Sequence, residues 1–178
     1  MTSLNSCLQY LLLILQLSFV LGRFMNFTKT QHSFNEKYLK NFTTWLENGA
    51  LNVDADTERV FEYGFRGNLV VQIKIGNSKN YQRMFAYDYD VCKVLSEISR
   101  DSIVNYWYRM VLKHSNIMEN CPMPKAHYYI HNMRLDGNSL PVFLRPSEYQ
   151  IISTHYFGKR KTKSYEMALR LVAGIRIY

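Results

Sequence analysis

The chain has 178 residues, with 22 Lys and Arg against 14 Asp and Glu and a formal net charge of +8. A hydrophobic share of 47% and a charged share of 20% exclude an intrinsically disordered or collagen-like chain. The aromatic share of 15% indicates one globular domain with a buried core and favours strands.

The first 22 residues are predicted to be a cleaved signal peptide. They contain no Lys, Arg, Asp or Glu, and residues 11–21 are almost wholly apolar. Val20 and Gly22 suit the −3 and −1 positions of a signal-peptidase site, so we place cleavage after Gly22. The alternative is an uncleaved anchor helix, but this apolar stretch is shorter than the roughly 20 residues that a bilayer span requires. Residues 23–178 would then form a single secreted domain.

Two N-x-T sequons follow the proposed cleavage site, and they predict N-glycosylation of Asn26 and Asn41. The surrounding stretch, residues 24–56, shows no clear periodicity otherwise. We expect it to add one strand or a short helix.

Apolar and polar residues begin to alternate at residue 69. Within residues 69–75, apolar side chains at 69, 71, 73 and 75 alternate with polar ones at 72 and 74, which predicts a half-buried strand. A turn at residues 76–80 and a strand at 81–91, with Tyr and Phe on one parity, would complete a hairpin. Residues 59–65 are predicted as a preceding strand.

Two cysteines, Cys92 and Cys121, remain once Cys7 leaves with the signal peptide. An even count in an oxidising compartment predicts one disulfide, which would stabilise the fold by roughly 3 to 4 kcal/mol. The alternative is a pair of free buried thiols. Between the cysteines, hydrophobic positions recur every three or four residues and predict an amphipathic helix, capped by Ser99 or Ser102. The positions are Ile103, Trp107, Met110, Val111, His114 and Ile117.

Three further strands are predicted, at residues 127–135, 148–157 and 165–178, with turns at 136–139 and 158–163. Six or more strands and one helix, joined by short links, are typical of a mostly all-β protein. The predicted fold is therefore an antiparallel β-sandwich with one amphipathic helix between the two mature cysteines.

The sequence offers no positive support for catalysis. P-loop, G-x-S-x-G and dinucleotide-binding motifs are absent. His127 and His131 have the spacing of a zinc helix, but in a strand their rings would lie roughly 13 Å apart. The residues from 54 onward begin like a calcium-binding loop, but Arg59 occupies the position that requires Gly, so the motif is incomplete. Asp88 and Asp90 share a strand face without an indicated partner. We expect a non-enzymatic protein without a cofactor or a metal.

The turn before the last predicted strand carries Lys159, Arg160, Lys161 and Lys163. Most such runs are only solvated. The sharper hypothesis is attraction to an anionic membrane surface, at about 1 kcal/mol per basic residue. A receptor is another candidate partner, whereas nucleic acid is not expected of a secreted protein.

Three segments together resemble an insect family of secreted domains of unknown function that includes the CheB chemosensory proteins. They are the Tyr87 to Leu95, Ser115 to Pro122 and Leu144 to Tyr149 segments. The resemblance implies a relationship to the ML lipid-recognition proteins, which are immunoglobulin-like β-sandwiches that hold an apolar ligand between splayed sheets. Family members often carry further N-terminal cysteines, and this chain has none between Arg23 and Val91.

By this resemblance, the leading hypothesis is a secreted binding protein for a lipid or another hydrophobic small molecule, in chemosensory or pheromone perception. The candidate cavity residues are Leu69, Val71, Ile73, Phe85, Met133, Ile151, Leu169 and Leu171, with Trp107 and Met110 as a lid. One alternative is an extracellular interaction module with a filled core, which binds a protein or an acidic glycan through its basic face. Another is a secreted hydrolase. An apolar pocket of at least ~300 Å³ would favour the first hypothesis.

Overall fold

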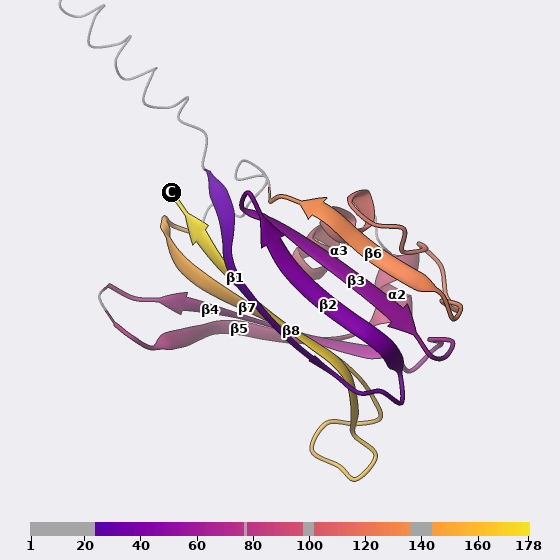
Figure 1. Cartoon of the computed structure of the whole chain (residues 1–178). Coiled ribbons are helices and arrows are strands. Elements are labelled where there is room, and N and C mark those ends of the chain that lie inside the picture. The colour runs from indigo at the N-terminus through magenta and orange to yellow at the C-terminus, as the bar shows by residue number, and fades with distance from the viewer. Residues whose placement is uncertain (1–23, 77, 98–101, 136–143) are drawn as a thin grey trace, which may run out of the picture.

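The computed structural model describes residues 24–76, 78–97, 102–135 and 144–178. Within these residues two antiparallel sheets pack face to face, which confirms the predicted β-sandwich (Figure 1). The strands are β1 (Met25–Phe34), β2 (Leu39–Glu47), β3 (Ala50–Thr57), β4 (Arg66–Lys74), β5 (Tyr81–Asp90), β6 (His127–Met133), β7 (Ser147–Phe157) and β8 (Glu166–Ile177). Two short helices, α2 (Val91–Ser96) and α3 (Ile103–Lys113), lie between β5 and β6 in the chain. The proposed signal peptide lies outside the described residues.

The larger sheet has five strands in the order β1-β8-β7-β4-β5. Its register aligns inward-facing residues into rows across the sheet, and one such row is Leu69 of β4, Ser153 of β7 and Leu171 of β8. All three are at least 90% buried. The alternation read from the sequence therefore marks the inner face of this sheet.

The smaller sheet, in the order β2-β3-β6, corrects the expectation for the N-terminal stretch. Instead of one strand or a short helix, residues 24–57 supply three strands. In β3 the inward residues are Leu51, Val53 and Ala55, which are buried. In β2 the register shifts between Leu39 and Asn41, so its alternation is interrupted.

The predicted strand at residues 59–65 is also wrong. This segment forms only an isolated bridge, between Phe61 and Met123, and then turns toward β4. Phe61 and Phe65 stack with their ring centroids 4.5 Å apart, and both are buried. Aromatic packing, rather than a strand ladder, therefore holds this segment against the sandwich.

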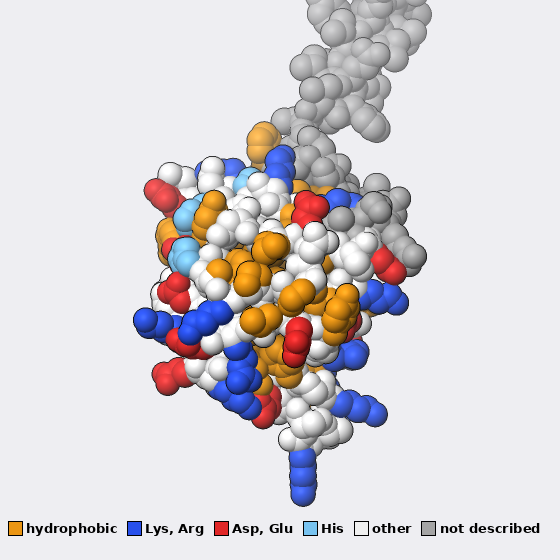
Figure 2. All heavy atoms as spheres, turned by 90° about the vertical axis from the view of Figure 1, so that its right-hand side faces the viewer, with side chains coloured by type: hydrophobic (Ala, Val, Ile, Leu, Met, Phe, Trp, Pro, Cys, Tyr) orange, Lys and Arg blue, Asp and Glu red, His pale blue; other side chains and the backbone are white. Residues whose placement is uncertain are grey.

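The sandwich is closed differently at its two sides. At one side β1 packs against β2 and joins the sheets, whereas α2 contacts β5 and α3 contacts β6. In the view of Figure 1 the helices lie behind β3 and β6. Viewed from the side on which β6 begins, hydrophobic side chains gather at the centre of the surface and charged ones surround them (Figure 2). The helices thus complete the wall where the two sheets do not meet.

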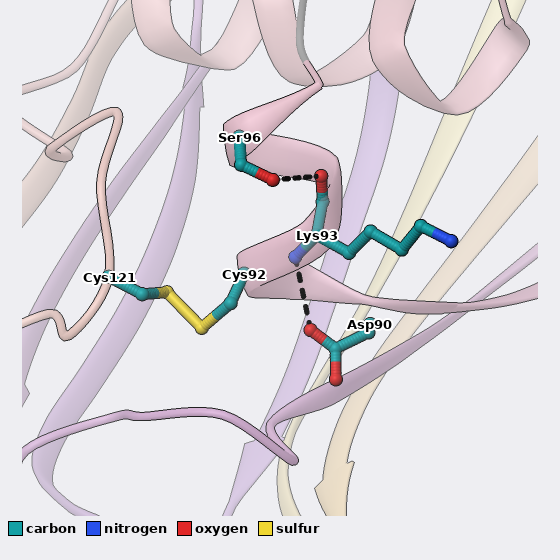
Figure 3. Close-up of a disulfide and its surroundings, with 5 residues drawn as sticks. All are labelled: Asp90, Cys92, Lys93, Ser96 and Cys121. Carbon is teal, nitrogen blue, oxygen red and sulfur yellow. Dashed lines mark hydrogen bonds between the residues drawn. A yellow bond between two sulfur atoms is a disulfide. The ribbon is translucent and has the colours of Figure 1, made fainter.

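The predicted disulfide is present and joins Cys92 in the first turn of α2 to Cys121 (Figure 3). Asp90 caps this helix, because its carboxylate accepts a hydrogen bond of 3.1 Å from the backbone N–H of Lys93. The hydroxyl of Ser96 donates to the carbonyl of Lys93 at 2.9 Å. The disulfide therefore anchors α2 to the segment that leads into β6.

The predicted amphipathic helix is α3, and Ser102 is its N-cap residue. The backbone N–H of Asn105 donates to the Ser102 hydroxyl at 3.0 Å. The helix ends at Lys113, short of Ile117, because the chain leaves it to run beside β6. There the N–H of His131 donates to the carbonyl of His114 at 2.8 Å. The alternative N-cap, Ser99, lies outside the described residues.

Candidate ligand cavity between the sheets

A cavity of about 150 Å³ lies between the two sheets and the helices. β3 contributes Leu51, Val53 and Ala55, and β8 contributes Leu169 and Leu171 from the opposite sheet. The rest of the described lining is Leu39, Phe42, Thr57, Phe61, Phe65, Val91, Leu95, Trp107, Tyr108, Val111, Ile117, Met123, Tyr128, Tyr129, Ile130, Met133, Ser153 and His155. No Lys, Arg, Asp or Glu occurs among these residues, so the cavity carries no fixed charge.

The few polar groups of the lining include Tyr108 and His155. The Tyr108 hydroxyl and His155 Nε2 lie 3.0 Å apart and share a hydrogen bond. Burial lowers the pKa of His155 to about 4 and raises the pKa of Tyr108 well above its usual value near 10. Both side chains are therefore neutral near pH 7, because desolvation disfavours the charged form of each.

The His155 ring is held by aromatic neighbours. It stacks on Phe65 at a centroid distance of 5.5 Å and meets the ring of Tyr89 edge-on at 6.3 Å. Its Nδ1 is buried and has no hydrogen-bond partner among the described residues. An imidazole in such surroundings contributes mainly an apolar ring face to the cavity.

A second, smaller cavity of about 60 Å³ lies further along the inner face of the large sheet. Its walls include Ile175 and Ile177 of β8 and Tyr149 of β7. Trp107 of α3 lines both cavities. The indole therefore forms part of the boundary of each.

The candidate cavity residues from the sequence divide between these two spaces. Met133, Leu169 and Leu171 line the larger cavity, Leu69, Val71, Phe85 and Ile151 line the smaller one, and Trp107 lines both. Ile73 and Met110 are partly buried against the core and line neither of them.

Sequence reasoning missed one complete wall of the larger cavity. This wall comes from β2 and β3, where residues 24–56 had shown no legible pattern. The alternation of Leu51, Val53 and Ala55 with polar residues was nevertheless visible and would have found β3. Phe61 and Met123 come from irregular segments, and their place in the wall depends on the bridge between them.

Other candidate residues lie away from the cavity. His127 and His131 occupy β6 and are exposed, and the Nε2 atoms of both approach one carboxylate oxygen of Asp54, at 3.5 Å and 3.1 Å. The two rings therefore lean toward each other and lie closer than the roughly 13 Å expected from strand geometry. His127 also contacts Asp56 at 2.8 Å. Among the described residues, no group of three or more His, Cys, Asp and Glu side chains is arranged to hold a metal ion. These histidines therefore make surface hydrogen bonds with the two aspartates.

The two aspartates of β5 serve different purposes. Asp88 accepts a hydrogen bond of 2.9 Å from the Tyr156 hydroxyl, whereas Asp90 is the cap of α2. The two carboxylates are therefore engaged with separate partners.

The basic turn and the sequons are on the surface. Lys159, Arg160, Lys161 and Lys163 are exposed on the loop between β7 and β8, which projects from the sandwich (Figure 1). Arg160 approaches Asp88 at 3.5 Å. Asn26 of β1 and Asn41 of β2 are exposed as well. In the described part of the chain, no helix combines the length and hydropathy of a membrane-spanning segment.

The fold and cavity define a disulfide-linked β-sandwich with an apolar space between its sheets. Residues 67–151 match a family described as "Protein of unknown function (DUF1091)". The match begins in β4, includes both helices and the disulfide, and ends in β7. It supports a resemblance to a family of unknown function, while the resemblance to chemosensory and lipid-recognition proteins stays a prediction. A comparison with curated proteins gives no match.

Proposed function

We propose that this protein binds one small, neutral, apolar molecule in the cavity between its sheets. The observation that carries this proposal is an uncharged cavity of about 150 Å³ bounded by both sheets and both helices. Apolar space of this kind excludes water, because a water molecule needs two to four polar partners. An apolar guest that enters it gains about 0.8 kcal/mol per buried methylene.

The volume limits the size of the guest. A pocket for a drug-sized ligand measures about 300 Å³ or more, twice the volume available here. An engineered apolar cavity of about 150 Å³ in another protein binds benzene. The guest that fits is therefore of benzene size or is a short alkyl chain, smaller than a whole membrane lipid.

The lining also limits the charge of the guest. The cavity walls contain no Lys or Arg, and His155 is neutral at pH 7. A carboxylate inside would lose its hydration without gaining a cationic partner, which is highly unfavourable. An alcohol, an ester or a hydrocarbon is therefore preferred over a fatty-acid anion.

We place this binding outside the cell. The disulfide between Cys92 and Cys121 is typical of proteins from oxidising compartments, where such bonds persist. The predicted signal peptide and sequons point in the same direction. A role in perceiving hydrophobic chemical signals is in keeping with these features and with the resemblance to chemosensory proteins.

A cavity-filling substitution tests the proposal. Ala55→Phe adds a ring to the wall of the larger cavity, and Ala86→Phe places the same ring on an exposed position of β5 as a matched control. Binding of toluene, 1-hexanol and hexanoate is measured by NMR titration at pH 7. We expect the parent and Ala86→Phe to bind toluene and 1-hexanol, and Ala55→Phe to bind them at least tenfold more weakly.

Hexanoate is the control for charge and should bind at least tenfold more weakly than 1-hexanol. Equal binding by the Ala55→Phe variant would show that the guest sits elsewhere. A parent protein that binds neither neutral probe would favour the alternative, an interaction module with a filled core.

A further inference from the structure

The two cavities lie one after the other along the same strands. On β8, Leu169 and Leu171 line the larger cavity and Ile175 and Ile177 line the smaller one. Ala173, which is 1% exposed, lies between these two pairs in the strand. Since alternate residues of a strand face the same side, all five side chains point toward the core. The cavities are therefore neighbours along one inner face.

The neighbouring strand shows the same division. On β7, Ser153 and His155 line the larger cavity, whereas Tyr149 and Ile151 line the smaller one. Ile151 pairs with Ala173 of β8 in the sheet register. Both strands thus pass from one cavity to the other at the same level of the sheet.

Helix α3 contributes residues to the linings of both cavities. Tyr108 and Val111 line only the larger of the two cavities, and Tyr106 lines only the smaller one. Trp107 is the residue common to both linings. Its indole is the largest side chain among the twenty amino acids, and it is in contact with both spaces.

We propose that Trp107 determines the maximum length of the bound molecule, because its indole divides one long apolar channel into two short cavities. This inference rests on the proposed function. Neither described lining contains a Lys, Arg, Asp or Glu side chain, so the joined channel would be as uncharged as its two parts. A variant that lacks the indole would accept a longer alkyl chain of the same neutral class.

A series of straight-chain alcohols from 1-butanol to 1-decanol tests the inference. In the parent, affinity should rise with chain length by about fourfold per methylene and then stop rising once the larger cavity is full. In Trp107→Ala this limit should move to alcohols at least two methylenes longer. The longest alcohols should bind this variant at least tenfold more tightly than they bind the parent.

The matched control is the other tryptophan of the chain, Trp45, which is 38% exposed on β2. Trp45→Ala makes the same substitution away from both cavities and should leave the chain-length limit unchanged. Because Trp107→Ala removes core packing, Trp107→Leu is measured in parallel, and thermal unfolding confirms that each variant is folded.

Fluorescence gives a second measurement that needs no cavity-creating variant. In Trp45→Phe, Trp107 is the sole tryptophan, and alcohols that fill the larger cavity should shift its emission. An unchanged length limit in both folded Trp107 variants, or an unchanged emission on saturation, would overturn the role of Trp107. Such a result leaves the proposed function intact provided that the parent binds the short alcohols, whereas failure of the parent to bind any of them removes both.

Discussion

The contribution of the disulfide to the free energy of unfolding can be calculated from the length of the loop that it closes. Cys92 and Cys121 are 29 residues apart, and the chain-entropy relation for a loop of this length gives about 3.6 kcal/mol at 25 °C. The enclosed loop contains α2 and α3, which form one wall of the larger cavity. Replacing both cysteines with alanine should therefore lower the free energy of unfolding by roughly 3 to 4 kcal/mol.

Urea unfolding of the parent and the double variant, under oxidising and under reducing conditions, measures this difference in the free energy of unfolding. For a domain of this size, 1 kcal/mol corresponds to about 2 to 4 °C in Tm, so the double variant should melt roughly 10 °C below the parent. Alanine is chosen because Cys92 is 3% exposed and a serine hydroxyl would be buried there. The reduced parent should fall within about 1 kcal/mol of the double variant, since both lack the same cross-link.

Two results would refute this reasoning. A double variant within about 1 kcal/mol of the oxidised parent would mean that the unfolded chain is not appreciably restricted by the loop. A reduced parent as stable as the oxidised one would lead to the same conclusion without any substitution.

Two further predictions concern the packing of β4 and the acid stability of the core. A Cβ at Gly67 would lie 2.2 Å from the ring of Tyr89, so Gly67→Ala should destabilise the protein by about 1 to 3 kcal/mol in urea unfolding. In a Tyr89→Ala background the same substitution should cause little further loss of stability. Fully additive losses in the double variant would contradict the clash. The pKa of His155 is lowered from 6.5 to about 4 by burial, so the unfolded chain takes up a proton first as the pH falls, and stability should drop by about 3 kcal/mol between pH 7 and pH 4 through this group. His155→Phe should lose that part of the pH dependence, and an unchanged slope would show that other groups cause it.

Four strands of the large sheet, β4, β5, β7 and β8, were legible because apolar residues recur at period two over most of each strand. Leu69, Val71 and Ile73 follow one another at period two, and their partners in β7 and β8 do the same. Such a pattern needs no knowledge of the rest of the chain, because burial of one sheet face imposes it locally. The disulfide could be predicted from the cysteine count alone, because two cysteines allow only one pairing.

The N-terminal strands were hidden by local irregularities. The register of β1 shifts between Phe27 and Lys29, and that of β2 shifts between Leu39 and Asn41. An extra residue in a strand moves every following side chain to the other face. Thus Leu39 and Phe42 are both buried although they are three residues apart, a spacing that the period-two alternation of a regular strand does not give.

The amino-acid sequence by itself determined the fold class, the disulfide and most of the apolar residues that face the interior, because these depend on local periodicity and on composition. Only the tertiary structure decided how much of that interior is empty, that Trp107 lines both cavities, and that the larger one measures about 150 Å³, below the ~300 Å³ that would favour a lipid-sized ligand. The physical reason is that a cavity is the small difference between the space enclosed by two sheets and the volume of side chains from distant segments. Neither quantity can be read from any one stretch of the chain.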